Sequence, residues 1–205
     1  MPVAPNPAKV LLYVAERAQQ GPALPVETVL VDFRAGEQNT PAHRARSPFG
    51  TVPVLELHDG THLVESLTII EYLEEKYPEG ALTCGSVEQR ARARQVERIV
   101  EQRVAVPMMR YVHATNSPLG LAPDPSVAGA IAEALPRALG FVEDLLADGR
   151  ELLLGERVSI ADCTLAAGCQ FARFGGAELL ADFPALRGWD QRYRARPAAT
   201  GVLVA

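Results

Sequence analysis

A glutamate followed by a serine, Glu65 and Ser66, stands where a helix is predicted to begin, and this pair could bind a charged ligand. Unpaired backbone N–H groups and the helix dipole favour a carboxylate at a helix N-terminus, and the Ser66 hydroxyl adds a donor there. The Glu65 carboxylate beside it could hold a cationic amine. The pair would therefore suit the free amino-acid end of a small molecule. The alternative is that Ser66 only caps the helix and that Glu65 is solvated.

The elements that must position this pair are predicted by a change of hydrophobic period. An apolar run at Val54–Leu57, an Asp-Gly turn signal at residues 59–60 and an apolar return at Leu63–Val64 predict a β-hairpin. The period then changes from two to about 3.6, which predicts a helix that ends near Tyr77. The stretch is therefore predicted to form strand, tight turn, strand and helix.

The Val52-Pro53 step precedes the first of these strands. An X-Pro bond prefers the trans form by only about 0.5–1 kcal/mol, so a fold can hold it in the cis form at little cost. We predict a cis bond here. The alternative is an ordinary trans proline at the beginning of a strand.

Two spaced motifs, PFGTVP at residues 48–53 and ES at residues 65–66, agree with the strands and helix predicted around them. On these residues the chain resembles the soluble glutathione transferases, and the resemblance covers nearly its whole length. It implies an α/β thioredoxin-like domain at residues 1–78 and an all-α helical domain at residues 86–205. It also implies a homodimer that uses glutathione as co-substrate, without a metal, to modify a small hydrophobic electrophile, a reaction typical of detoxification.

The resemblance implies that six residues contact glutathione: Gln38, Thr51, Val52, Pro53, Glu65 and Ser66. Glu65 and Ser66 would hold the γ-glutamyl end. Val52, preceding a cis proline, would pair its backbone with the cysteinyl part like an added strand. Gln38 and Thr51 occupy further contact positions of the family, and solvated loop roles are the alternative for both.

The turn before the first predicted helix has Ala4 where the family has a thiol-activating Ser, Thr, Cys or Tyr. Lowering a thiol pKa from about 8.5 to about 6.5 requires roughly 2.7 kcal/mol. A helix N-terminus supplies about 0.3–1 kcal/mol, and a hydrogen bond to a charged group about 1.5–3 kcal/mol. Pro5 and Pro7 have no N–H, which leaves the Asn6 amide and the backbone N–H groups of Asn6 and Ala8. We predict Asn6 as the catalytic residue; a structural turn asparagine is the alternative.

The rest of the first half is predicted from its patterns. Residues 7–20 predict a helix whose apolar face includes Val10, Leu11 and Val14, and residues 1–3 are all that remains for a preceding strand. Val26–Phe33 alternates and predicts another strand.

A short helix is predicted at Pro41–Arg46, ahead of the proline motif. Within that motif, the resemblance implies that Phe49 inserts into a partner subunit, where one aromatic anchor can dominate an interface. The alternative is that Phe49 packs within its own chain.

The second half is predicted to be helical, at residues 87–114, 126–146, 160–174 and 184–194. Ser159 and Asp162 form a capping box before the third of these helices, with a role in folding rather than catalysis. The family binds its electrophile in the cleft between the domains. We expect Met109, Tyr111, His113 and Phe171 to form this electrophile site, and Phe174 to line the same cleft.

Composition sets the remaining limits. The chain has 205 residues, of which 48% are hydrophobic and 22% charged, as expected of a soluble globular protein. Its net charge of −5 argues against a general nucleic-acid binder, and no apolar run has the length of about 18 residues needed to span a membrane. Three cysteines without a Cys-x-x-Cys motif indicate a reducing cytoplasm. His58 and His62 lie across a turn, on opposite strand faces, and do not predict a metal site.

The favoured function is therefore transfer of the glutathione thiolate to a small electrophile. One alternative is glutathione-dependent disulfide reduction, and another is a non-catalytic glutathione-fold module for binding or assembly. Ala4 favours the non-catalytic module, whereas the motifs at Val52-Pro53 and Glu65-Ser66 favour ligand binding.

Overall fold

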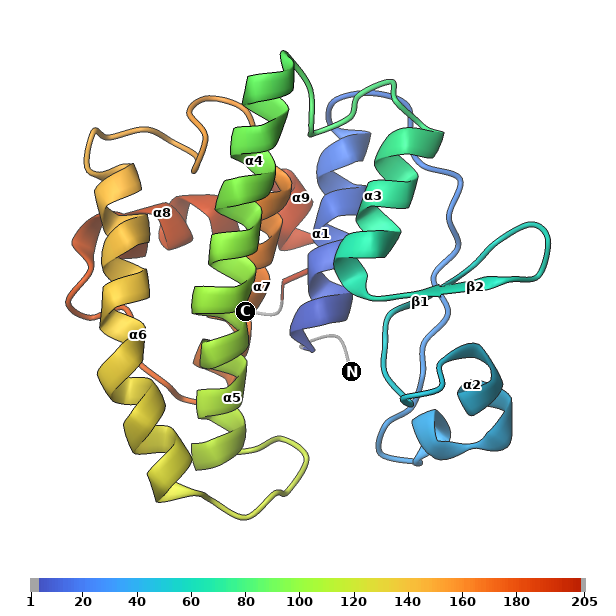
Figure 1. The fold of residues 1–205 in the computed structure, drawn as a ribbon, viewed down its shortest axis with the longest axis horizontal. Helices are drawn as coiled ribbons and strands as arrows, with labels where there is room; N and C mark the ends of the chain where they lie inside the picture. The colour runs from blue at the N-terminus through green and yellow to red at the C-terminus, as the bar shows by residue number, and fades with distance from the viewer. Residues whose placement is uncertain (1–3, 204–205) are drawn as a thin grey trace.

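A computed structural model describes residues 4–203 as a small α/β unit followed by a helical unit (Figure 1). The first unit contains α1 (Pro5–Ala18), the 3-10 helix η1 (Glu37–Asn39), α2 (Pro41–Arg46), β1 (Val54–Glu56), β2 (His62–Val64) and α3 (Ser66–Lys76). The second contains α4 (Val87–Ile99), the π-helical turn η2 (Val100–Ala105), α5 (Val106–Thr115), α6 (Pro125–Leu146), α7 (Ile160–Phe174), α8 (Pro184–Arg194) and the unpredicted α9 (Pro197–Thr200). The predicted fold class is confirmed, and the domain boundaries at residues 78 and 86 stay a prediction.

The predicted hairpin forms. β1 and β2 are antiparallel, with Val54 opposite Val64 and Glu56 opposite His62. The turn between them is closed by Asp59, whose Oδ1 accepts hydrogen bonds from the backbone N–H of Thr61 at 2.9 Å and from its hydroxyl at 2.6 Å. The Asp-Gly turn therefore sets the pairing of β1 with β2, and with it the pair Val54–Val64 at the end of the hairpin next to α3.

The strand predicted at Val26–Phe33 does not form, and this prediction was wrong. In residues 4–203 the only sheet is the β1–β2 pair, and the segment runs extended without a neighbouring strand. Val29 and Leu30 each remain 76% exposed. Alternation of apolar and polar residues favours a strand, but a strand also needs a partner for its backbone hydrogen bonds. The strand expected at residues 1–3 lies outside the described residues.

The buried face of α1 is not the predicted one. Val10, Leu11 and Val14 are only half-buried. Six positions of α1 are buried, and three of them are charged (Lys9, Glu16 and Arg17); the others are Ala8, Leu12 and Tyr13. The reason is that α1 lies between α3 and α7, so the helix is covered on two sides (Figure 1). A purely apolar pattern could not predict which charged residues find partners there.

The buried charges of α1 tie it to both units. The Arg17 guanidinium lies 3.3 Å from Glu74 of α3, and the Tyr13 hydroxyl donates to the same carboxylate at 2.8 Å. On the other side of the helix, Arg196 donates two hydrogen bonds to Glu16, at 2.7 and 2.8 Å. Buried charges are tolerated because each has such a partner.

The single helix predicted at residues 87–114 contains a π-helical turn instead of running regularly. Pro107 has no N–H to donate to the carbonyl four residues before it. The helix is wound more loosely just before this point: the N–H of Val106 donates to the carbonyl of Glu101, five residues back. Such turns are frequent at functional sites, and this one faces α1 across the boundary between the two units.

The core of the helical unit is α7, as predicted. Its residues from Ile160 to Ala172 are all buried. Burial raises the pKa of the thiols of Cys163 and Cys169, so both remain protonated. No helix within residues 4–203 is both long enough and apolar enough to cross a membrane.

Candidate functional site

The two sequence motifs meet at one end of the hairpin. Val54, the first residue of β1, pairs with Val64, the last residue of β2, so Pro53 and Glu65 adjoin the same end of the hairpin. The Val52-Pro53 peptide bond is cis. In the described part of the chain, no hydrogen bond engages the backbone N–H or C=O of Val52. The end of the hairpin therefore offers an unpaired backbone edge beside the start of α3.

Glu65 has an unusual backbone conformation. Its φ of 72° and ψ of 117° make it the only non-glycine residue with a positive φ among residues 4–203. Holding such a conformation costs about 1–3 kcal/mol, and such residues cluster at ligand sites. Its side chain is exposed. Nothing in the amino-acid pattern predicted this strain, because glutamate has no preference for positive φ.

Ser66 is the first residue of α3 and only 5% exposed. Glu65, not Ser66, is the N-cap residue of α3, and the Ser66 hydroxyl has no hydrogen-bond partner among the described residues. Capping therefore does not account for this serine. Its hydroxyl and the unpaired N–H groups of the first turn of α3 are free to bind an anionic group.

Two buried polar residues that the sequence analysis missed hold the loop before the cis bond. Ser47 Oγ accepts a hydrogen bond from the backbone N–H of Thr51 at 3.0 Å. His43 Nε2 lies 3.1 Å from the carbonyl oxygen of Thr51. His43 and Ser47 are four residues apart, at the end of α2, and this spacing next to a proline motif was the available signal.

Gln38 is brought against the same loop. A Cβ atom on Gly50 would lie 2.9 Å from the backbone oxygen of Gln38, and Gly50 has a φ of 64°, so glycine is required on both grounds. The side-chain oxygen of Gln38 is buried and has no hydrogen-bond partner within the described residues. Thr51, next in the chain after Gly50, is exposed.

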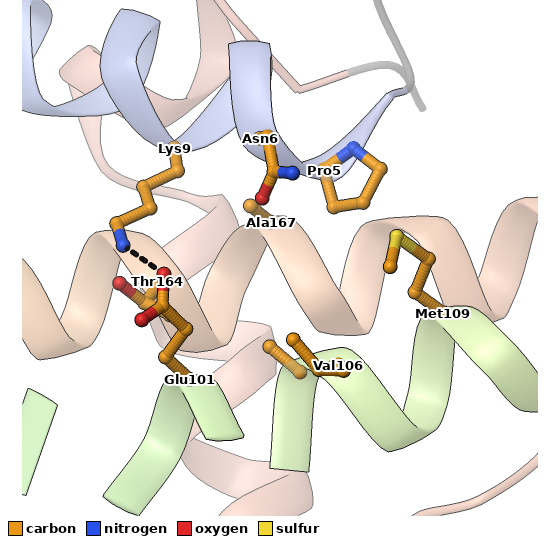
Figure 2. Close-up of a pocket in the computed structure, with 9 residues that line it drawn as sticks. Pro5, Asn6, Lys9, Glu101, Val106, Met109, Thr164 and Ala167 are labelled. Atoms are coloured by element: carbon orange, nitrogen blue, oxygen red, sulfur yellow. Dashed lines mark hydrogen bonds and ion pairs between the residues drawn. The ribbon is translucent and has the colours of Figure 1, made fainter. Parts of the chain in front are cut away.

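Asn6 lies on the first turn of α1 and lines a cavity of about 20 Å³ at the boundary of the two units (Figure 2). Met109 of α5, predicted for the electrophile site, lines the same cavity, so the structure brings these two residues together. One predicted donor is lost, because the N–H of Ala8 donates to the carbonyl of Ala4 at 3.0 Å. The side-chain amide of Asn6 remains available.

The other predicted electrophile residues lie further along α5 and α7. His113 is four residues after Met109, on the same face of α5, and its Nδ1 is 2.9 Å from the hydroxyl of Ser117. Burial lowers the pKa of His113, so the ring is neutral at pH 7. Phe171 is buried with its ring centroid 5.4 Å from that of His113, whereas Phe174 is exposed. Tyr111 is half-buried against the core.

The chain matches two family models over most of its length. Residues 1–81 match the N-terminal domain of glutathione S-transferases, and residues 89–192 match their C-terminal domain. A probable glutathione S-transferase of Oryza sativa subsp. japonica is 31% identical, over 86% of this chain and 83% of the relative.

Solved structures agree with these matches. The crystal structure of Gtt2 from Saccharomyces cerevisiae superposes with a TM-score of 0.86 at 27% identity, covering 99% of this chain and 98% of that one. A glutathione transferase from Burkholderia graminis, crystallised with two glutathione molecules per subunit, gives 0.80 at 27% identity, over 99% and 85% of the two chains. The chain therefore belongs to the glutathione S-transferase family.

Proposed function

We propose that this protein binds glutathione at the end of the hairpin and transfers its thiolate to a small hydrophobic electrophile. The observation that carries the proposal is the meeting of the unpaired Val52-Pro53 edge with the strained Glu65 and the free Ser66 hydroxyl. A binding site for a peptide with a zwitterionic end needs these groups together. The glutathione-bound relative supports the choice of ligand.

In this proposal each end of glutathione has its own partners. The γ-glutamyl carboxylate accepts hydrogen bonds from Ser66 and the first turn of α3, and the γ-glutamyl amine pairs with Glu65. Val52 pairs with the cysteinyl backbone as an added strand would. Gln38, next to the same loop, donates from its amide to the glycyl end, near Thr51.

The thiolate is proposed to lie at the first turn of α1, where Asn6 donates a hydrogen bond to it. The thiol proton passes to solvent when the thiolate forms. Ala4 supplies no hydroxyl, so the Asn6 amide would provide about 1.5–3 kcal/mol of thiolate stabilisation.

Replacing Asn6 by alanine is expected to lower conjugation about tenfold to a hundredfold, because a donor to the thiolate is lost. Ala4→Ser is expected to raise turnover, since it restores a hydroxyl at that position. Steady-state kinetics with a generic aromatic electrophile measure both changes. If the rates of both variants equal that of the wild type, this turn has no part in the reaction.

The proposal is tested by titrating glutathione into the protein by calorimetry and then measuring conjugation. Binding followed by turnover is expected. An absence of binding at millimolar glutathione would reject the glutathione site altogether.

A non-catalytic role is the second candidate, and the observation that favours it is Ala4 in place of the usual activating residue. Glutathione binding without conjugation would select a binding or assembly module, unless the same protein reduces a mixed disulfide with glutathione, which would select the reductase. The three free cysteines support a reducing cytoplasmic setting for any of these roles.

A homodimer is proposed as the working form. Phe49 is 72% exposed, and an aromatic side chain of this size at the tip of an ordered loop suits insertion into a partner subunit. The structure therefore leaves Phe49 unpacked within its own chain, contrary to the alternative that the sequence left open.

Phe49→Ala is expected to shift the protein from dimer to monomer, since truncating an anchor residue costs about 2 kcal/mol or more of association free energy. Light scattering coupled to size exclusion over a concentration series measures the mass. The control is Phe174→Ala, another exposed phenylalanine, which should leave the mass unchanged. A wild type that is monomeric at all concentrations would contradict the proposal.

A further inference from the structure

Lys9 is a buried cation at the boundary between the two units. Its side chain is 1% exposed, and its ammonium donates to Glu97 at 2.8 Å and to Glu101 at 2.9 Å. These three residues come from α1, α4 and the π-helical turn η2, respectively. The hydroxyl of Thr164 on α7 lies 3.1 Å from the same oxygen of Glu97. One lysine therefore connects the α/β unit to two segments of the helical unit.

The Lys9 ammonium is paired only where it lies next to both Glu97 and Glu101. Arg98 pairs with the second oxygen of Glu101, whereas the second oxygen of Glu97 is buried and has no hydrogen-bond partner in the described residues. Cys163 of α7 interacts electrostatically with Lys9. Burial raises the pKa of the Cys163 thiol, so the thiol stays protonated. Moving α1 along the helical unit would separate Lys9 from both carboxylates and leave buried charges unpaired, which is strongly unfavourable.

Lys9 also lines the small cavity beside which the thiolate is proposed to lie. It follows Asn6 by three residues on the same face of α1, and both side chains line this cavity (Figure 2). Glu101, Val106 and Met109 form the facing wall, from η2 and α5. The ion pairs of Lys9 therefore span the gap between the residue that would stabilise the thiolate and the helix that would hold the electrophile.

We propose that Lys9 is a positioning residue for the transferase reaction: its pairs with Glu97 and Glu101 hold Asn6 at a fixed distance from the electrophile wall of α5. The inference rests on the proposed function. It assigns Lys9 no contact with glutathione, because the Lys9 ammonium is already engaged by Glu97 and Glu101.

The test compares three variants of the full chain. Lys9→Met keeps the length of the side chain and removes its charge. Lys9→Met combined with Glu97→Met removes both buried charges, and apolar replacement of a buried pair often restores stability. Lys76→Met changes the only other lysine of the sequence, which is exposed at the end of α3, and serves as the control.

For Lys9→Met we expect the dissociation constant of glutathione to stay within about twofold of the wild type while kcat falls about tenfold to a hundredfold, because small misplacements of reacting groups have effects of this size. The double variant should regain the melting temperature of the wild type but not its kcat. Lys76→Met should match the wild type in all three measurements.

Recovery of kcat together with the melting temperature in the double variant would overturn the inference, since Lys9 would then serve stability alone. An unchanged kcat in folded Lys9→Met, or weaker glutathione binding by the folded variants, would also overturn it. A wild type that fails to bind glutathione rejects the proposed function instead, and the role of Lys9 with it. A wild type that binds without turnover leaves no reaction to position and likewise contradicts the role.

Discussion

Glutathione affinity is expected to fall about tenfold to a hundredfold when Glu65 is replaced by glutamine, because a charge-assisted hydrogen bond contributes about 1.5–3 kcal/mol. The substitution keeps the size of the side chain and removes the charge that would pair with the γ-glutamyl amine. The Glu65 side chain has no intramolecular partner among the described residues, so the loss should appear in binding and not in stability. Calorimetric titration of both proteins at one pH measures the change.

Glu75→Gln is the matched control, because Glu75 is an exposed acid on the same helix and gives the same change in net charge. Its affinity for glutathione should equal that of the wild type. Equal losses in both variants would mean that the net charge of the protein, and not Glu65 itself, attracts the ligand. An unchanged affinity in Glu65→Gln would contradict the proposed contact with the amine.

Asp162→Ala is expected to lower the free energy of unfolding by about 3–5 kcal/mol, because several buried donors lose their acceptor and each such loss costs about 1–3 kcal/mol. The carboxylate is fully buried and accepts from the backbone N–H groups of Leu153 and Ser159, each at 2.9 Å. It also accepts from the Ser159 hydroxyl at 2.7 Å and from Trp189 Nε1 at 3.3 Å. Four donors would lose their acceptor in the variant. Urea denaturation measures the change.

Ser159→Ala provides the comparison for this prediction. It removes one hydroxyl from the capping box and leaves the other three donors paired, so about 0.5–2 kcal/mol should be lost. Both variants should bind glutathione normally while folded, because neither residue belongs to the proposed site. If Asp162→Ala is no less stable than Ser159→Ala, the network is not what holds α7 against its neighbours.

The hairpin, α3 and α7 could be predicted because their signals are local. An Asp-Gly turn between apolar runs sets a register, and a nearly all-apolar stretch after a capping box makes a buried helix. The strand at Val26–Phe33 was predicted on equally local grounds, but strand formation depends on a neighbour that the pattern cannot supply. The buried face of α1 was missed because Lys9, Glu16 and Arg17 are buried only through partners distant in the sequence.

The candidate site also contains some features that local sequence signals predict and others that depend on the fold. The motifs containing Val52-Pro53 and Glu65-Ser66 carried a family resemblance, and the hairpin register places them together. The positive φ of Glu65 has no signal in residue type, because the fold imposes it where β2 ends and α3 begins. The π-helical turn could have been inferred from Pro107, but the contact of Glu101 with Lys9 depends on how the two units pack.

The most direct test of the account is a titration of isotopically labelled protein with glutathione, followed by backbone amide resonances. The account predicts that the amides of Val52, Glu65 and Ser66 shift progressively with ligand, whereas those in the middle of α6 do not move. Saturable shifts confined to other parts of the chain, or none at millimolar glutathione, would contradict the claim that a zwitterionic peptide lies between the hairpin end and the start of α3.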